Sequence, residues 1–443
     1  MQIKKTKKYK DYYRLILRIL VLIIIFFSVV GQVSLNRPVE PWSQEQPVFQ
    51  FSLPQLGFFS FSIGGKIQNL VYGALIFWLL GCFWDKKLRP RYTDLTLKVL
   101  CFIIVFGISW AFSPVRYLSW KTGMRDLLIE GGFFFILMSV FRLPKYRKTA
   151  FVVLMSGVSL TVFAGLLLYL RGDYFPQTPQ RLWLSFYHPN SSGSALVLLI
   201  PIMLSFLLSR TSIQLRLLCA LVLVILGVAM YLTYSRTAWF SLLVAILVLS
   251  LRWKRSYYLI SALVLVFLLL VLGINLGPQT FLKDRVKMEF WKDPNVNKRL
   301  IYWEAAVHMF VARPLFGSGP GYGVFMHSYE SCFKKIETGE LPPGPHNQYL
   351  CVAASTGCLG LLAFIWLFIT LIKNLSRVER RAINPFDRNF SAGLKAGLIG
   401  FLVGFLADDP LLNIRVSFLF WLLLGFLAAQ MAHRRVLPDN SHL

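Results

Sequence analysis

Charged residues are scarce in this chain, and acidic residues are the scarcest of them. Only 15% of the 443 residues are charged, and 20 Asp and Glu stand against 47 Lys and Arg, which gives a formal net charge of +27. An average soluble protein has about 25% charged residues. Hydrophobic residues make up 56% of the chain, which is too many for a soluble nucleic-acid-binding protein. The composition therefore excludes a soluble enzyme and a disordered chain, and it indicates a membrane protein with positive charges at the ends of its spans.

Cysteine is also scarce, and its spacing points to no special chemistry. The six cysteines include no C-x-x-C pair, and most of them lie in apolar stretches where they act as small apolar side chains. This pattern excludes a small disulfide-stabilised scaffold. A disulfide bond between Cys332 and Cys351 is left open by the sequence. The chain also has no internal repeat of the kind that transporters often show.

Long apolar runs, by contrast, recur along the whole chain. A membrane-spanning helix needs about 20 mostly apolar residues. Twelve stretches fit this requirement: 15–34, 67–84, 95–113, 124–141, 150–170, 190–209, 214–233, 238–252, 257–275, 348–372, 391–407 and 412–431. We therefore expect an all-α, polytopic integral membrane protein with about 12 transmembrane helices. Residues 233–237 form either a tight outside turn or a break within one helix.

The distribution of Lys and Arg predicts the orientation of these spans. Basic residues crowd the amino terminus and every second loop after it, and 28 of the 47 Lys and Arg fall on that side. Because cytoplasmic loops carry the excess of basic residues, both termini are predicted to be cytoplasmic. No Ala-x-Ala-like cleavage site follows the first apolar stretch, so we expect it to be an uncleaved span.

This topology divides the chain into three parts. Residues 1–275 are expected to form transmembrane helices 1–9, residues 276–347 a long outside loop, and residues 348–443 transmembrane helices 10–12 with a short cytoplasmic tail. Within the loop, apolar residues at helical spacing predict a helix over 298–312. The pair Arg313-Pro314 is expected to end that helix.

A glycine-rich segment, Pro-Leu-Phe-Gly-Ser-Gly-Pro-Gly-Tyr-Gly, follows over residues 314–323. Glycines at this density indicate tight turns and close approach of the backbone to its neighbours. A nucleotide-binding loop would need a strand before the glycines and a helix after them, and those flanks are not predicted. Two interpretations stay open, a structured turn beside a functional site and a purely structural turn.

Three basic side chains stand out on the predicted outer face. Arg236 lies in the short break at 233–237, where an unpaired charge is costly and needs an anionic partner. Arg299 begins the predicted loop helix, and His346 lies at the outer mouth of the tenth span. Because guanidinium groups suit bidentate contact with phosphate, these residues predict a site for a phosphate-bearing, membrane-embedded donor. The alternative is that each arginine pairs with an Asp or Glu of the chain.

Acidic residues on the same predicted face are expected to have a structural role. Asp408 and Asp409 lie in the last outside turn, with Arg415 as their expected partner. The sequence shows no Asp, Glu and His cluster with a plausible metal geometry on this face. We therefore expect no metal and no cofactor.

The order of these motifs resembles the O-antigen ligase/polymerase superfamily. The resemblance covers about residues 180–430 by motif and the whole chain by topology. It rests on Ser235-Arg236, Arg299-x-x-x-Trp303-x-x-Ala306, Pro314-Leu315-Phe316-Gly317-x-Gly319-x-Gly321 and His346-Asn347-x-x-Leu350. The motifs are individually loose, but their order and the long loop before the tenth span make the combination specific.

The resemblance implies a bacterial membrane glycosyltransferase of the GT-C type. Such an enzyme takes a glycan from undecaprenyl-diphosphate on the periplasmic side of the inner membrane, by an inverting and metal-independent reaction. In a ligase, the glycan passes to the lipid A-core oligosaccharide in lipopolysaccharide biosynthesis. The partners expected from this resemblance are the carrier-linked donor, the lipid A-core acceptor and membrane lipids, with no nucleic acid.

The resemblance also assigns roles to individual residues. His346 aligns with a general base for the acceptor hydroxyl, and an imidazole with an ordinary pKa near ~6.5 can accept a proton at neutral pH. Arg236 and Arg299 align with arginines that bind the diphosphate of the donor. Accessory roles fall to Asn347, Gly317, Gly319, Gly321 and His188, of which His188 either lines the donor groove or serves the entry of the sixth span.

Other functions remain as alternatives. A polymerase of the same family would use a second carrier-linked glycan as acceptor. A protein O-oligosaccharyltransferase is disfavoured because such members usually carry an additional carboxy-terminal region. A transporter or flippase would place polar residues at the middle of broken helices, whereas the polar residues here gather at one interface.

Overall fold

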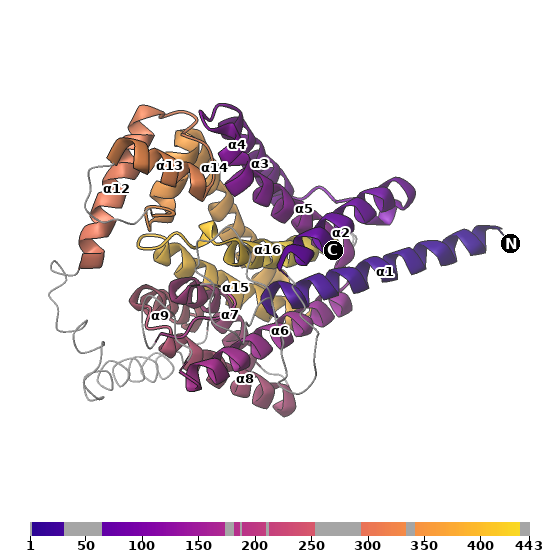
Figure 1. Cartoon of the computed structure of the whole chain (residues 1–443). Helices are drawn as coiled ribbons and strands as arrows, with labels where there is room; N and C mark the ends of the chain where they lie inside the picture. Colours follow the sequence, from indigo (N-terminus) through magenta and orange to yellow (C-terminus); the bar gives the residue numbers. More distant parts are fainter. Residues whose placement is uncertain are drawn as a thin grey trace, which may run out of the picture.

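The described part of the chain is entirely helical. In a computed structural model, the structure describes residues 2–30, 64–172, 181–186, 188–209, 212–252, 294–333 and 342–434, and no strand occurs among them (Figure 1). A backbone that spans a bilayer must satisfy its hydrogen bonds internally, and a helix does so within one segment. The prediction of an all-α polytopic membrane protein is confirmed.

Eleven of the twelve predicted spans coincide with helices, and the remaining one, the ninth span at 257–275, lies outside the described residues. The matching helices are α1 (Gln2–Val30), α2 (Gly64–Trp84), α3 (Asp94–Ala111), α5 (Arg125–Val140), α6 (Pro144–Leu170), α7 (Pro189–Leu207), α8 (Ile213–Leu232), α9 (Arg236–Ser250), α14 (Gln348–Arg381), α15 (Pro385–Gly404) and α16 (Ile414–Arg434). Seven helices of the described residues are long and apolar enough to cross a membrane. Two shorter apolar helices, Asn69–Trp84 within α2 and Arg236–Ser250, which is α9, also occur among these residues. The count of twelve spans therefore stays a prediction.

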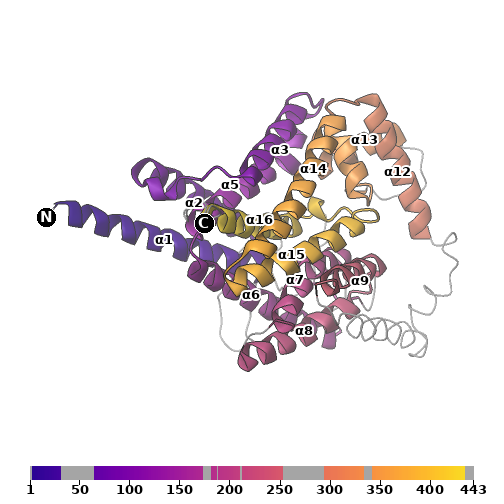
Figure 2. The same ribbon diagram turned by 180° about the vertical axis from the view of Figure 1, so that it is seen from behind.

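Helix α16 lies inside the bundle and α8 at its edge (Figures 1 and 2). In α16, 83% of the apolar stretch is buried, against 22% in α8. Helix α15 packs closely on α7 and α9, because Gly393 and Gly397 face the α7 backbone and Gly400 faces that of α9 at Ser241. Small residues allow such close approach of membrane helices.

The described part of the predicted periplasmic loop contains two helices, α12 (Pro294–Ala312) and α13 (Tyr322–Phe333). The first confirms the helix predicted over 298–312, whereas the second was not predicted. Both lie beside α14 at one end of the bundle (Figure 2). Their apolar cluster is separate from the main core and consists of Tyr302, Ala305, Ala306, Met309, Phe325, Tyr329 and Ala354.

The glycine-rich segment between these helices docks them onto the bundle. Three serine hydroxyls donate hydrogen bonds to carbonyl groups of the segment, namely Ser109 to Phe316 (2.6 Å), Ser113 to Ser318 (2.7 Å) and Ser119 to Pro320 (2.8 Å). Ser109 and Ser113 lie in and just after α3, and Ser119 ends the short helix α4 (Arg116–Ser119), which is followed by the π-helical turn η2 (Trp120–Met124). The segment is thus fastened to α3 and α4.

On its other side, the glycine-rich segment fits into a kink of α14. Gly357 interrupts the helix with φ 67° and ψ −166°. A Cβ atom at Gly357 would lie 2.3 Å from the Leu315 oxygen, and a Cβ atom at Gly317 (φ +68°) would lie 2.3 Å from the Ser355 backbone. The N–H groups of Ser318 and Gly319 donate to the carbonyls of Ala354 (3.0 Å) and Ser355 (2.8 Å). These glycines are required where two backbones meet.

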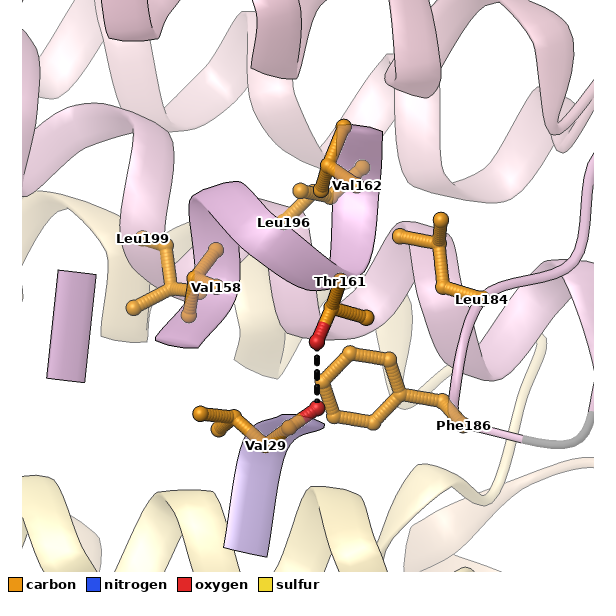
Figure 3. Close-up of a pocket in the computed structure, with 8 residues that line it drawn as sticks. All are labelled: Val29, Val158, Thr161, Val162, Leu184, Phe186, Leu196 and Leu199. Carbon is orange, nitrogen blue, oxygen red and sulfur yellow. Dashed lines mark hydrogen bonds between the residues drawn. The ribbon is translucent and has the colours of Figure 1, made fainter. Parts of the chain in front are cut away.

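A small apolar pocket lies between α1, α6, α7 and residues 184–186 (Figure 3). Thr161 in its wall donates a hydrogen bond to the Val29 carbonyl at 2.7 Å. Its lining residues are Val29, Val158, Thr161, Val162, Leu184, Phe186, Leu196 and Leu199. None of these side chains is charged, so this pocket does not offer the groups that a diphosphate requires.

Candidate active site

Five helix ends meet at one end of the bundle, which we call the site face. Helices α7, α9 and α14 begin there, and the α15–α16 turn (405–413) joins them. Arg181 connects the first two, because its Nε donates to the Thr233 carbonyl at 2.8 Å and its Nη2 donates to Asn190 Oδ1 at 2.7 Å. Gly193 allows α7 to approach α9 closely, since a Cβ atom there would lie 2.6 Å from that of Ala238.

The start of α14 is fastened to the α15–α16 turn. The Gln348 N–H donates to the carbonyls of Phe405 (2.9 Å) and Asp408 (3.1 Å). Asn347 caps α14 by accepting the Leu350 N–H at 3.0 Å, and its Nδ2 donates to the Leu406 carbonyl at 3.0 Å. The predicted accessory residue Asn347 thus has a structural task, which is to place His346 against the turn.

His346 is held directly by two carboxylates of that turn. Its N–H donates to Asp409 Oδ2 at 2.8 Å. Its ring atom Nδ1 lies 3.5 Å from Asp409 Oδ1 and 3.7 Å from Asp408 Oδ1. The backbone of His346 has φ +50°, a conformation that non-glycine residues rarely adopt. Gly344 makes room for this contact, because a Cβ atom there would lie 2.2 Å from Asp409 Oδ2.

The two carboxylates change the acidity of the imidazole. Burial favours the neutral ring, but Asp408 and Asp409 outweigh it and raise the pKa of His346 to about 9. Burial also opposes ionisation of Asp408, yet the His346 ring and the Arg299 charge lower the pKa of that carboxyl. His346 therefore carries a proton at neutral pH as the partner of these carboxylates, contrary to the ordinary pKa assumed from the sequence.

The expectation that no Asp, Glu and His cluster exists on this face is wrong. The side-chain donor atoms of His346, Asp408 and Asp409 all lie within 4.8 Å of one another. The sequence conceals this cluster because His346 and Asp409 are 63 residues apart and meet only through the α15–α16 turn. Arg415, the expected partner of the two acids, donates to the Ser185 carbonyl.

Helix α12 carries two residues that lie near this cluster, the predicted site residue Arg299 and the unpredicted Tyr302. Arg299 is half-buried, and its charge acts on both Asp408 and His188. Tyr302, nearly one turn further along α12, stacks obliquely on His346, with ring centroids 6.0 Å apart at 44°. Arg299 thus lies close enough to Asp408 for its charge to act on that carboxyl, and its role in binding a donor stays a prediction.

Arg236 is the first residue of α9 and is exposed on the site face. Ser235 caps the helix by accepting the Ala238 N–H at 3.4 Å, and Tyr234 adopts φ +48°. Residues 233–235 thus form a tight turn between two helices, which decides between the two interpretations of this break. Its link to the start of α7 is Arg181, which binds the Thr233 carbonyl.

Arg181 was missed by the sequence analysis. It is buried, with 4% of its surface exposed, and it joins the start of α7 to the turn before Arg236. In the sequence it is one arginine ahead of an apolar run, and nothing in its spacing distinguishes it. Only the fold shows that it lies on the same face as Arg236, Arg299 and His346.

His188 caps the start of α7. Its Nδ1 accepts the Asn190 N–H at 3.1 Å. Burial, together with the neighbouring Arg181 charge, lowers the pKa of His188 to about 4. Both interpretations from the sequence therefore remain compatible with its position, since it serves the helix entry and also lies on the site face.

The predicted accessory glycines occupy the docking segment. The atoms nearest to an added Cβ belong to Ser355 for Gly317, Ser113 for Gly319 and Thr122 for Gly321. Their positions thus explain how α12 and α13 are placed relative to α3 and α14. Any direct contact of these glycines with a donor stays a prediction.

Part of the chain matches a known protein family. Residues 221–365 match the model of a family described as O-antigen ligase. This range contains Arg236, Arg299 and His346, whereas His188 and the α15–α16 turn lie outside it. No curated protein matches the chain.

Proposed function

We propose that this chain, as a member of the O-antigen ligase and polymerase superfamily, transfers a glycan from undecaprenyl-diphosphate to lipid A-core oligosaccharide. The reaction would take place on the periplasmic face of the bacterial inner membrane, with both termini in the cytoplasm. The observation that carries the proposal is the contact of His346 with Asp408 and Asp409 on the face where Arg299 and Arg236 lie.

His346 has the orientation of a general base for the acceptor. Because its Nδ1 faces two carboxylates, the Nδ1 proton stays there and Nε2 is the atom that accepts a proton. The acceptor hydroxyl gives its proton to Nε2 as its oxygen attacks the anomeric carbon of the donor sugar. Asp408 and Asp409 orient the ring and stabilise the imidazolium that forms.

The raised pKa determines when this base is available. Since the pKa of His346 is about 9, only about one ring in a hundred is neutral at pH 7. The neutral ring is then a stronger base than an ordinary histidine. We expect transfer to rise with pH up to about 9, because deprotonation of Nε2 must precede proton abstraction.

The arginines serve the leaving group. As the acceptor oxygen forms its bond to the anomeric carbon, the bond from that carbon to the diphosphate oxygen breaks. The electron pair stays on the diphosphate, where Arg236 and Arg299 stabilise the growing negative charge. Displacement from the opposite side inverts the configuration at the anomeric carbon.

The carboxylates in this proposal belong to the base and not to a metal. Their assigned task is to hold His346, whose backbone N–H donates to Asp409 Oδ2 at 2.8 Å. We therefore expect full transfer in the presence of EDTA. A loss of transfer in EDTA that Mg²⁺ restores would contradict this part of the proposal.

The test is reconstitution of the full chain in proteoliposomes with a defined undecaprenyl-diphosphate-linked glycan. Lipid A-core and a second carrier-linked glycan are offered as acceptors side by side. We expect product on lipid A-core, and product only on the carrier-linked acceptor would identify a polymerase. His346→Ala should lower transfer at least 1,000-fold by removal of the general base and its ion pair.

The matched control is His308→Ala, because His308 lies on α12 with 67% of its side chain exposed. It should insert, fold and transfer like the wild type. Retention of near-normal transfer by His346→Ala would refute the assignment of the base.

A further inference from the structure

Ser109, near the end of α3, carries a buried hydroxyl that contacts two separate segments of the chain. Only 1% of the residue is exposed. Its oxygen lies 2.6 Å from the Phe316 carbonyl and 2.8 Å from the Ser355 carbonyl. Because a serine hydroxyl has one hydrogen to donate, this hydrogen serves a carbonyl of the glycine-rich segment and a carbonyl of α14. Ser109 thus links these two segments to each other as well as to α3.

The contact with Ser355 lies directly before the break in α14. A non-helical residue such as Gly357 interrupts the hydrogen bonds of a helix, and the backbone groups beside it need other partners. The glycine-rich segment supplies such partners. Two of its N–H groups donate to α14 carbonyls, and the Cys358 N–H donates to the Pro314 carbonyl at 2.8 Å. The segment therefore takes the place of part of a helical turn, and we call this meeting of the two backbones the joint.

Helix α12 and the first part of α14 lie side by side between the joint and His346 (Figure 2). Tyr302 of α12 stacks obliquely on His346. Ala306, one turn further along α12, packs in one apolar cluster with Ala354, which is further along α14. The two helices thus run in the same direction. Both reach the joint at one end, and at the other end they carry Arg299 and His346.

The position of α12 at the joint therefore affects the spacing at the site. Arg299 belongs to α12, and its charge acts on Asp408. His346 belongs to the start of α14 and is fastened to the α15–α16 turn through Asp409. In the proposed reaction, one residue stabilises the leaving group and the other activates the acceptor, so their spacing matters. A misplacement of about 1 Å can slow a reaction about 100-fold.

We propose that Ser109 is a positioning residue for glycan transfer, whose hydroxyl links the glycine-rich segment to the break in α14 and thereby keeps Arg299 correctly placed relative to His346. It acts through α12 and the joint. This inference rests on the proposed function, and it adds a residue of α3 to the structure that arranges the same site.

Three serines allow a matched set of variants. Ser109→Ala removes the hydroxyl that serves both carbonyls of the joint. In Ser113→Ala the lost hydrogen bond is the one to the Ser318 carbonyl, which belongs to the glycine-rich segment. Ser391→Ala is the control for stability, because the Ser391 hydroxyl is also fully buried and links α15 to Gln430 of α16 at 3.0 Å, away from the site face. If Ser109→Ala folds poorly, Ser109→Cys retains a weaker donor of similar size.

The first measurement is hydrogen exchange of the full chain in lipid nanodiscs. We expect Ser109→Ala to exchange faster than the wild type at residues 314–323 and 354–358, because the hydrogen bonds of the joint open more often. Ser391→Ala should exchange like the wild type in these two ranges. This result does not depend on glycan transfer.

The second measurement is transfer in proteoliposomes, expressed per folded protein. We expect Ser109→Ala to lower kcat about 10- to 100-fold, Ser113→Ala to lower it less, and Ser391→Ala to leave it unchanged. The changes are then repeated in the Arg299→Ala background. Because Arg299 is the residue that is positioned, Ser109→Ala should lower kcat there by less than about twofold.

A merely structural role would give a different result in this cycle. If Ser109→Ala lowered kcat by the same factor with and without Arg299, the two residues would act independently and the inference would be overturned. A wild-type kcat in Ser109→Ala, together with faster exchange at the joint, would overturn it as well. If the wild-type chain transferred none of the offered glycans, the proposed function itself would be refuted, whatever the exchange experiment showed.

Discussion

Each end of α15 carries an ion pair, and the two pairs are built differently. Near the start of the helix, Asp387 accepts two hydrogen bonds from Arg147, at 3.1 Å from Nε and 2.6 Å from Nη2. Just past its end, Asp408 and Asp409 face His346 at 3.7 and 3.5 Å. With 20 residues in α15, the two sites lie about 30 Å apart.

The comparison shows what distinguishes a structural pair from a functional one. The Arg147 side chain is 1% exposed, and its Nη1 also donates to the carbonyls of Phe141 and Arg142, so its donors serve the fold. The His346 side chain is 30% exposed and its backbone has φ +50°. Strained backbone and looser contacts at an accessible group are features of functional sites. A closed pair fastens helices together, and an open one remains available to a ligand.

The largest effect is expected from breaking the closed pair. Arg147→Ala leaves the Asp387 carboxylate buried without its guanidinium partner and should lower the free energy of unfolding by about 3–5 kcal/mol. An SDS unfolding titration of the purified chain in detergent measures this loss. Because the pair lies far from the site face, the fraction that stays folded should transfer glycan at the wild-type rate.

A double variant separates the ion pair from its surroundings. Arg147→Met combined with Asp387→Leu removes both charges and should recover most of the lost stability, since an apolar replacement of a buried pair is often tolerated. A single variant that unfolds within about 0.5 kcal/mol of the wild type would show that the pair is not the fastening described here.

The fold was largely predictable because its signals are local. Hydropathy alone located eleven helices, since a spanning segment must be apolar along its own length. The helix over 298–312 followed from side chains one turn apart, and its end near Arg313 followed from the proline at position 314. Helix α13 was not predicted, because its start at Tyr322 falls among the glycines of the docking segment.

The candidate site was predictable only in part, because its contacts connect distant segments. His346, Arg236 and Arg299 were found through motif order. Asp408 and Asp409 were predicted to pair with Arg415, since that residue is close to them in the sequence. In the fold, His346 contacts Asp409 across 63 residues instead. The assumed pKa near ~6.5 for His346 was wrong for the same reason, because the carboxylates that raise it to about 9 are invisible in the local sequence.

An intermediate effect is expected from opening the His346 cluster further. Asp409→Asn removes one of the two carboxylates that raise the pKa of His346, while the amide oxygen can still accept the His346 N–H. The pKa should fall by about 1–2 units, which corresponds to about 1.4–2.7 kcal/mol. The rising limb of the pH profile of kcat/KM should therefore move from about 9 to lower pH, with a lower maximum because the base is weaker and less well oriented.

The control for this variant is Asp126→Asn, which removes a carboxylate that pairs with Arg125 at 3.0 Å. Its pH profile should match that of the wild type. A midpoint that stays at about 9 in Asp409→Asn would mean that the carboxylates do not set the basicity of His346, and the contrast between the two ends of α15 would lose its functional meaning.

The smallest effect is expected from removing one of two cations that lie beside the same carboxylate. Glu379, near the end of α14, accepts a hydrogen bond from Lys395 at 2.5 Å and lies 3.7 Å from Arg252 Nε. Lys395→Met keeps the aliphatic stem and leaves Arg252 beside the carboxylate, so the free energy of unfolding should fall by less than about 1 kcal/mol. Adding Arg252→Met should cost more than the sum of the two single changes, because Glu379 then loses both cations. The same SDS titration measures all three proteins. If Lys395→Met lowered the free energy of unfolding as much as Arg147→Ala, Arg252 would not compensate for the lost lysine. Each cation beside Glu379 would then be needed for stability by itself.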